Sequence, residues 1–232
     1  MMLGVEKLEE KCLMATLVSQ VGSLLTVTGD GKANDVEVFQ STPGGLVTVY
    51  VENQPVFTSS TITNIVLLGN GGDDTLTNNT FIDSVILGGN GDDTIQGGGG
   101  SDSLFGENGD DIITNFVTDA NYVPIGAFTT DLLSGGNGND RLWGGWGSSD
   151  TLLGGNGDDT MYDIVGGSNF FDGGRGNDWT IGRTGVGLPT NPISGGGLIA
   201  DTFSLDKHDV HLVQFDAGTQ ATGPVLINGT LY

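Results

Sequence analysis

Residues 88–114 contain three consecutive copies of a nine-residue pattern. The copies read GGNGDDTIQ, GGGGSDSLF and GENGDDIIT, and no residue separates them. Glycine stands first and fourth in each copy, aspartate sixth, and an aliphatic residue eighth. A fixed period of this kind predicts a repeat architecture, in which each copy is one unit of a stack and contacts its neighbours. We therefore interpret the rest of the chain as extension, interruption or capping of this unit.

The same pattern recurs on both sides of this stretch. One copy, GNGGDDTLT, begins at Gly69, and a second group runs from GGNGNDRLW at Gly135 to GGRGNDWTI, which ends at Ile181. Between the groups, residues 115–134 break the period, although their last nine residues still place aspartate sixth and leucine eighth. The aspartates at the sixth position, or at its equivalent in a lengthened copy, are Asp74, Asp93, Asp102, Asp111, Asp131, Asp140, Asp150, Asp159 and Asp178.

The flanking regions are predicted to cap the repeats. Apolar residues such as Leu25 and Val27 alternate with polar ones, which predicts short strands joined by turns, and Gly31 and Asp35 are interpreted as a decayed first copy. The expected N-terminal segments are 1–21, either an amphipathic helix or a start codon assigned too early; 22–64, a β-meander cap; and 65–114, the first repeat block. The remaining ones are 115–134, an interrupting loop with a degenerate half-turn; 135–181, the second repeat block; and 182–232, a C-terminal cap in which an export signal is expected.

The nine-residue length allows a very thin fold. The last three residues of a copy are enough for a short strand, and the first six must reverse the chain, so two copies make one coil with two stacked parallel sheets. Burying one side chain such as Leu104 contributes about 1.5–3 kcal/mol, against about 1–2 kcal/mol of backbone entropy for every residue of the copy. Apolar burial alone therefore does not stabilise these repeats.

The stacked aspartates add repulsion that a cation would reverse. Two carboxylates at the strand spacing of about 4.8 Å repel by roughly 0.9 kcal/mol in water. Calcium takes about six to eight oxygen ligands in flexible geometry, and such turns offer backbone carbonyls as well as carboxylates. Zinc would prefer cysteine or histidine, but Cys12, His208 and His211 all lie outside the repeats.

Two other positions of the copy have an expected role. Glycine is expected where the turn needs positive φ or where backbones crowd, and the asparagines at the third position are expected to tolerate the same left-handed region. The acids at the fifth position are interpreted as solvated surface or as additional ligands, with the first slightly favoured; they are Asp73, Asp92, Asp110 and Asp158.

The pattern GGxGxDxU between Gly69 and Ile181 resembles the hemolysin-type, or repeats-in-toxin (RTX), calcium-binding family. The resemblance implies an all-β fold, a parallel β-roll (right-handed β-solenoid) with small β caps at both ends, in which several Ca²⁺ ions lie between a turn and the turn two copies later. The implied pairs are Asp74 with Asp93, Asp93 with Asp111, Asp140 with Asp159, and Asp159 with Asp178, with a weaker pair of Asp131 and Asp150 and with Asp102 alone on its edge.

Charge and composition limit the partners. The chain has 29 acidic and 7 basic residues, a formal charge of −22, which disfavours nucleic acids and anionic membranes. The sequence shows no transmembrane span and no cleavable signal peptide, and a single cysteine excludes an internal disulfide framework. We expect an extracellular monomer, exported without a cleaved N-terminal signal, whose partners are calcium ions and a cell-surface component or type I export machinery.

The expected function is calcium binding by a secreted, non-catalytic protein that extracellular calcium folds. The alternatives are an adhesion or surface-layer module, and the repeat portion of a larger secreted enzyme of protease, lipase or epimerase type, which the resemblance also implies. The sequence has no HExxH or GxSxG motif. The one polar cluster that could take part in catalysis is His208, Asp209 and His211, and an exposed strand with alternating residues is the favoured explanation for it.

Overall fold

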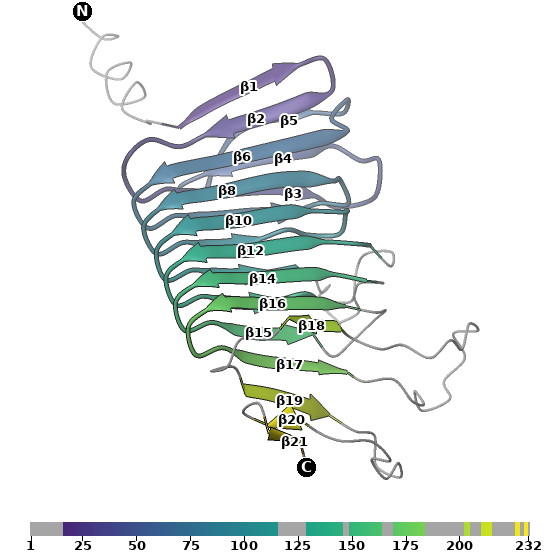
Figure 1. The fold of residues 1–232 in the computed structure, drawn as a ribbon. Coiled ribbons are helices and arrows are strands. Elements are labelled where there is room, and N and C mark those ends of the chain that lie inside the picture. The colour runs from purple at the N-terminus through teal and green to yellow at the C-terminus, as the bar shows by residue number, and fades with distance from the viewer. Residues whose placement is uncertain are drawn as a thin grey trace, which may run out of the picture.

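The computed structural model describes residues 16–115, 129–145, 149–163 and 169–183, and the strand backbones at 202–204, 210–214, 226–227 and 230–231. Every regular element in these ranges is a β-strand. The strands wind into a flattened roll with two large facing sheets (Figure 1). The predicted all-β parallel roll is confirmed.

Two sheets make the walls of the roll. The sheet at the front of Figure 1, here called the front sheet, contains β1 (Leu17–Val21), β2 (Leu24–Thr28), β6 (Asn64–Gly71), β8 (Ser84–Asn90), β10 (Ser103–Asn108), β12 (Leu132–Asn137), β14 (Thr151–Asn156), β16 (Phe170–Arg175) and β18 (Thr202–Ser204). The back sheet contains β19 (Val210–Gln214), β17 (Trp179–Arg183), β15 (Thr160–Asp163), β13 (Arg141–Trp143), β11 (Ile112–Thr114), β9 (Thr94–Gln96), β7 (Thr75–Asn79), β3 (Asp35–Gln40), β4 (Val47–Val51) and β5 (Gln54–Ser59). A separate antiparallel pair is formed by β20 (Leu226–Ile227) and β21 (Thr230–Leu231).

The chain alternates between the two sheets, so neighbouring strands within the roll are parallel. In the back sheet Leu76 pairs with Ile95, and Ile95 pairs with Ile113. The next partner of Ile113 is Leu142, beyond the interruption, and the parallel register continues unchanged. The stack of coils therefore continues across the interruption.

The core is a single layer of side chains between the sheets. The eighth-position residues are 0–1% exposed in both walls, and they are Leu76, Ile86, Ile95, Leu104, Ile113, Leu133, Leu142, Leu152, Met161, Phe171 and Thr180. Thr180 is the one polar member among these, because the last described coil has no aliphatic residue at that position. The core is as thin as the repeat length predicts.

The parallel roll begins earlier than residue 65. Strand β2 pairs in parallel with β6, and β3 pairs in parallel with β7, so the first coil lies within 22–64. Its turn aligns Gly29 with Gly69 and Asn34 with Asp74, and the decayed copy is therefore built on Gly29 and Asn34 instead of Gly31 and Asp35. The antiparallel strands β4 and β5 are inserted after β3, and this insertion hides the period in the sequence.

Several sequence predictions fall where the structure is not described. Residues 1–15 lie outside the described ranges, as do His208 and Asp209. His211 belongs to β19, of which only the backbone is described. In the part of the chain that is described, we find no helix with the length and apolarity required to cross a membrane.

Candidate metal centre

The turns that join the two sheets stack along two edges of the roll. Edge A, at the left of Figure 1, holds the turns that lead from the front sheet to the back sheet, such as 88–93 between β8 and β9. Edge B holds the turns that lead from the back sheet to the front sheet, such as 97–102 between β9 and β10. The sixth-position aspartates divide between these edges.

On edge A the sixth-position aspartates form one continuous column. They are 0–1% exposed, and they are Asp74, Asp93, Asp111, Asp140, Asp159 and Asp178. Oδ1 of each accepts a hydrogen bond from the backbone N–H of the sixth residue in the preceding coil, at 2.7–2.9 Å. The column includes a contact of Asp111 with Asp140, which the broken period in the sequence did not pair.

The second carboxylate oxygens of this column lie buried beside glycine. Oδ2 has no hydrogen-bond partner in the five residues Asp74, Asp93, Asp111, Asp140 and Asp159. A methyl group added at Gly88 would overlap Oδ2 of its own aspartate, and the same holds at Gly135. The first-position glycine is therefore required because it leaves space beside a buried carboxylate oxygen.

Burial changes the ionisation of these side chains. Loss of solvent, followed by the charges of neighbouring carboxylates, raises the pKa of Asp93 to about 6 and that of Asp159 to about 7, while backbone N–H donors oppose the shift. The pKa values of Asp111, about 7, and Asp140, about 6, are raised mainly by the same burial. A buried carboxylate oxygen without a donor is costly when charged, and a bound cation would remove that cost.

Backbone carbonyls of the same turns supply further oxygens. The third-position carbonyls are already occupied, because the carbonyl of Asn108 accepts the N–H of Gly91 at 2.9 Å and that of Asn156 accepts the N–H of Gly138 at 2.8 Å. The carbonyl oxygens of the fourth-position glycines accept no hydrogen bond within the described ranges. A methyl group at Gly138 would overlap the carbonyl oxygen of Gly109, so these glycines also permit close stacking of the coils.

The third-position asparagines do not adopt positive φ, and that prediction is wrong. They form an amide ladder in which Nδ2 of Asn108, Asn137 and Asn156 donates to Oδ1 of the preceding asparagine, at 3.1, 2.8 and 2.7 Å. Positive φ occurs at the second and fourth positions, as in Gly136 at 117° and Gly138 at 139°. The asparagines stabilise the turn through side-chain hydrogen bonds instead of through their backbone conformation.

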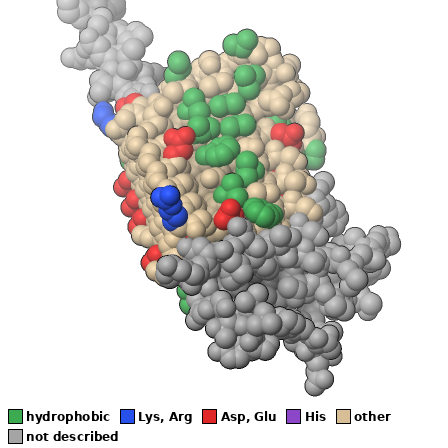
Figure 2. Space-filling view, in the orientation of Figure 1, with side chains coloured by type: hydrophobic (Ala, Val, Ile, Leu, Met, Phe, Trp, Pro, Cys, Tyr) green, Lys and Arg blue, Asp and Glu red, His purple; other side chains and the backbone are tan. Residues whose placement is uncertain are grey.

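The fifth-position residues form another ladder on the surface of edge A. Oδ1 of Asp73, Asp92 and Asp110 accepts the backbone N–H of the fifth residue in the next coil, at 3.0, 2.9 and 2.7 Å. These carboxylates are exposed, and Figure 2 shows acidic side chains in a row along this edge. Their structural role is to order the turn from outside while the sixth-position aspartates order it from inside.

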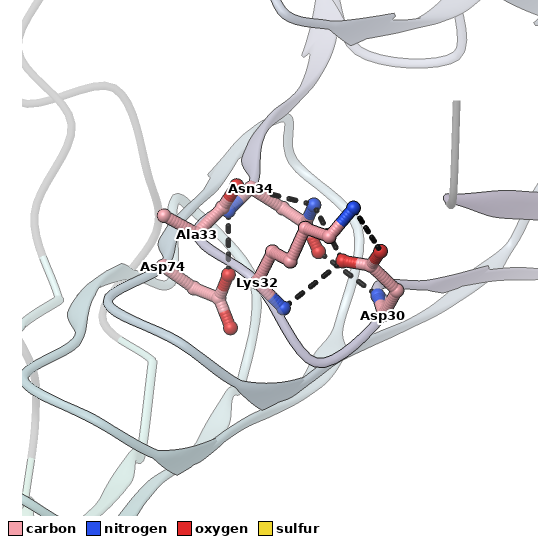
Figure 3. A network of polar contacts seen from close by, with 5 residues as sticks. All are labelled: Asp30, Lys32, Ala33, Asn34 and Asp74. Atoms are coloured by element: carbon pink, nitrogen blue, oxygen red, sulfur yellow. Dashed lines mark hydrogen bonds and ion pairs between the residues drawn. The ribbon is translucent and has the colours of Figure 1, made fainter. Parts of the chain in front are cut away.

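In the first turn of edge A, an asparagine takes the place of the sixth-position aspartate. Asn34 stands where the later turns have aspartate, and its backbone N–H donates to Oδ1 of Asp74 at 2.7 Å (Figure 3). Oδ1 of Asn34 accepts the N–H of Asp30 at 3.0 Å, and Oδ1 of Asp30 accepts the N–H of Lys32 at 3.0 Å. The carboxylate column therefore begins at Asp74.

Edge B carries a second column, and Asp102 is not alone in it as the sequence suggested. The N–H of Asp102 donates to Oδ1 of Asp131 at 2.8 Å, and that of Asp131 donates to Asp150 at 2.9 Å. The N–H and Oγ of Ser84 both donate to Oδ1 of Asp102, at 2.8 and 2.7 Å. Asp102 and Asp131 stay in register although the period is interrupted before Asp131, and the interrupted sequence obscures this alignment.

The interior of edge B is less regular than that of edge A. In the turn of edge B that begins at residue 115, the first position holds Asn115 where edge A has glycine. Oδ1 of Asn115 and Oδ2 of Asp102 both lie beside Gly97, the first residue of the neighbouring turn. Both oxygens are buried without a hydrogen-bond partner, and burial raises the pKa of Asp102 to about 8. Oδ2 of Asp131 differs, because it accepts a hydrogen bond from Oγ1 of Thr129 at 3.0 Å.

This arrangement fits calcium, which accepts both carboxylates and backbone carbonyls, better than it fits a metal that is bound by side chains alone. Within the described ranges, no group of three or more histidine, cysteine, aspartate or glutamate side chains could hold a metal. On edge A each turn from Asp74 to Asp159 contributes one buried carboxylate and unpaired backbone carbonyls, which are hard oxygen ligands in a flexible setting. The residues present therefore suit calcium, with both carboxylates and carbonyls as ligands.

The comparison with known families agrees with this chemistry. A family model described as RTX calcium-binding nonapeptide repeat (4 copies) matches residues 87–114, 125–161 and 165–186. No curated protein and no solved structure matches the chain. The matched ranges include every sixth-position aspartate except Asp74. The chain therefore contains RTX-type, or hemolysin-type, calcium-binding nonapeptide repeats in the matched ranges.

Proposed function

We propose that the protein is an extracellular, non-catalytic calcium-binding protein whose roll is stabilised by calcium. The observation that carries this proposal is the column of buried aspartates on edge A, five of which have one carboxylate oxygen without a hydrogen-bond donor. The five such residues are Asp74, Asp93, Asp111, Asp140 and Asp159. A calcium ion between successive turns would bind these oxygens together with the fourth-position carbonyls.

The stabilisation follows from mass action. At a free calcium concentration 100 times the dissociation constant, each independent site adds about 2.7 kcal/mol to the free energy of unfolding. Where calcium is scarce, the same site adds almost nothing, and the stacked carboxylates oppose folding. The chain would thus stay loosely folded in a cytosol and become rigid outside the cell, which is the basis for placing it there.

The proposed ligand sets differ between the edges. On edge A the pairs are Asp74 with Asp93, Asp93 with Asp111, Asp111 with Asp140, Asp140 with Asp159, and Asp159 with Asp178, in the order in which the hydrogen bonds connect them. On edge B the proposed ligands are Asp102, Asp131 and Asp150. These sites would be weaker, because polar side chains occupy part of the space that glycine leaves open on edge A.

Isothermal calorimetry on a pair of neighbouring substitutions tests the site assignment. Asp93→Asn removes a buried carboxylate, whereas Asp92→Asn removes an exposed one in the same turn, so the overall charge change is matched. We expect Asp93→Asn to lower the number of tightly bound calcium ions and Asp92→Asn to leave it unchanged. Unchanged stoichiometry and affinity in Asp93→Asn would refute the proposed site.

A further inference from the structure

The outer face of the front sheet is apolar. From β6 to β16 every strand presents two residues outward, and each strand contributes at least one large apolar side chain. These side chains are Val66, Leu68, Val85, Leu87, Phe105, Leu132, Leu153 and Phe170, and they are aligned by the parallel register. Figure 2 shows them as a continuous hydrophobic band down this face.

The back sheet has a different outer face. At the equivalent positions from β7 to β17, seven of the twelve outward residues are threonine, glutamine or arginine; the twelve are Thr75, Thr77, Thr94, Gln96, Ile112, Thr114, Arg141, Trp143, Thr160, Tyr162, Trp179 and Ile181. The two walls share the same core and the same turns. The difference between their outer faces is therefore not required by the fold, and it points to contact of the front sheet with another apolar surface.

The charge distribution selects the kind of surface. Among the twelve central outward positions of β6 to β16, two in each strand, Asp172 is the one charged residue, while Glu107 and Arg175 are exposed at the edge A ends of β10 and β16. An anionic membrane or an acidic partner would therefore find one arginine, at the margin of this face. A second copy of a chain with a charge of −22 would be repelled from the acidic edges but can approach this face.

We propose that two copies of the protein pack front sheet against front sheet about a two-fold axis parallel to the strands. This axis reverses the order of the coils, so β6 faces β16, β8 faces β14, and β10 faces β12. The two copies of Asp172 then lie at opposite ends of the interface. A two-fold axis along the stack would instead bring both Asp172 carboxylates to the same level.

Two of the facing pairs in this arrangement combine a large with a small side chain: Phe105 lies opposite Ser134 of the other copy, and Leu132 lies opposite Ser103. At each end of the interface the Asp172 carboxylate comes opposite Leu68. Val66, Val85 and Ser103 line part of a hollow in this face, and Phe170, which is 37% exposed, comes opposite Val66. Sheets that pack in this way interdigitate at a separation of about 10 Å.

The size of the face predicts a weak dimer. Six strands at a spacing of about 4.8 Å, each exposing about 17 Å of its length, offer roughly 500 Å² per copy. The total of about 1,000 Å² lies at the lower limit for a specific interface, so we expect a dissociation constant in the micromolar range. The dimer requires the folded roll, and it is therefore expected to form in the presence of calcium.

Sedimentation velocity on the full chain with excess calcium tests the proposal. The mass should rise from 23.9 kDa toward twice that value as the concentration increases from about 1 to about 200 μM. The double variant Leu87→Lys with Leu153→Lys, whose side chains face each other across the axis, should remain at 23.9 kDa. The matched control, Thr94→Lys with Thr160→Lys on the back sheet, should dimerise like the original chain.

The axis is tested by cross-linking in a Cys12→Ser background with a bismaleimide of about 10 Å reach, because the facing sheets are about 10 Å apart and a direct disulfide is too short to span them. Val66→Cys combined with Phe170→Cys should give a covalent dimer, because the two positions are about five strand spacings apart within one copy. Absence of the cross-link would refute this axis.

A mass of 23.9 kDa for the original chain at every concentration would refute the dimer, as would dimerisation of the front-sheet lysine variant. Circular dichroism of the same samples separates this failure from a failure of calcium-dependent folding.

Discussion

The two edges of the roll join the same two sheets but differ in their regularity. On edge A every described turn from the first to the sixth position spans six residues and begins with glycine, from Gly29 to Gly173. On edge B the corresponding turns vary in length, and the first position alternates between glycine and a polar residue such as Asn115 or Asp163. Edge A therefore repeats one geometry, whereas edge B changes it from coil to coil.

The comparison shows that a sixth-position aspartate does not make a site alone. Asp140 and Asp131 are both buried and both accept a backbone N–H, but Oδ2 of Asp140 lies beside Gly135, whereas Oδ2 of Asp131 is bound by Thr129. The residue that faces the carboxylate decides whether its second oxygen is free for a cation. We therefore expect calcium affinity to be higher on edge A than on edge B.

The largest effect is expected when the stacking of edge A is blocked. In Gly138→Ala the new methyl group overlaps the carbonyl of Gly109 at a residue with φ of 139°. We expect a loss of at least roughly 3 kcal/mol in the free energy of unfolding, measured by urea denaturation with calcium. The control is Gly31→Ala in the first turn of the same edge, where the methyl group meets no atom within 4 Å. Similar losses in both variants would contradict the account.

The next largest effect separates the two edges directly. Asp140→Asn is expected to weaken calcium binding at the adjoining sites at least tenfold, about 1.4 kcal/mol, because it removes the charge of a carboxylate with a free oxygen. Asp131→Asn should have a smaller effect, because Oδ2 of Asp131 already has a hydrogen-bond partner. Calorimetric titration measures both. Equal losses in the two variants would remove the distinction between the edges.

A pH dependence of opposite sign with and without calcium is also expected. The pKa values of Asp93 and Asp140, about 6, and of Asp111, about 7, lie above the ordinary value of 3.8, so the folded chain binds protons more tightly than the unfolded chain. Without calcium, stability should be present below pH 4 and be lost as the pH rises toward about 7. Calcium affinity should rise over the same interval.

Melting temperatures at several pH values, with a chelator and with saturating calcium, check this expectation. The chelator series should fall between pH 4 and 7, and the calcium series should not. A roll that becomes more stable with rising pH in the presence of the chelator would show that these carboxylates are not destabilising when charged.

The smallest effect concerns the amide ladder of edge A. In Asn137→Ser the shorter side chain loses its hydrogen bonds with Asn108 and Asn156, which are 2.8 and 2.7 Å long. These side chains are exposed, so we expect a loss of about 1 kcal/mol in urea unfolding. Asn177→Ser on the same edge serves as the comparison, because it removes a single, longer hydrogen bond to Asp158, of 3.3 Å, outside this ladder, and a smaller loss is expected. An equal loss there would mean that the ladder contributes nothing specific.

The regular parts of the fold were predictable from the sequence, and the reason is local. Every nine-residue copy carries its own turn, its buried aspartate and its core residue, so positions such as Asp93 and Ile95 need no long-range information. The amide ladder was missed because asparagine at the third position has two explanations, backbone conformation and side-chain pairing. The stacking of equivalent side chains decides between them, and a single copy does not contain that stacking.

The remaining differences arise where insertions interrupt the period. Strands β4 and β5 separate the turn at Asn34 from its neighbour at Asp74, and the long turn before Asp131 separates Asp102 from its partner. In both places the sheet register continues across the insertion, because the flanking strands keep the same parallel neighbours. Sequence spacing reports the length of an insertion but not whether the register survives it.

Circular dichroism during a calcium titration tests whether the roll depends on calcium. The chain is first treated with a chelator at neutral pH, where the buried aspartates of edge A are predicted to oppose folding. We expect a spectrum with little β-structure that changes cooperatively to a β-spectrum as calcium is added. A full β-spectrum in excess chelator, unchanged by calcium, would contradict this expectation.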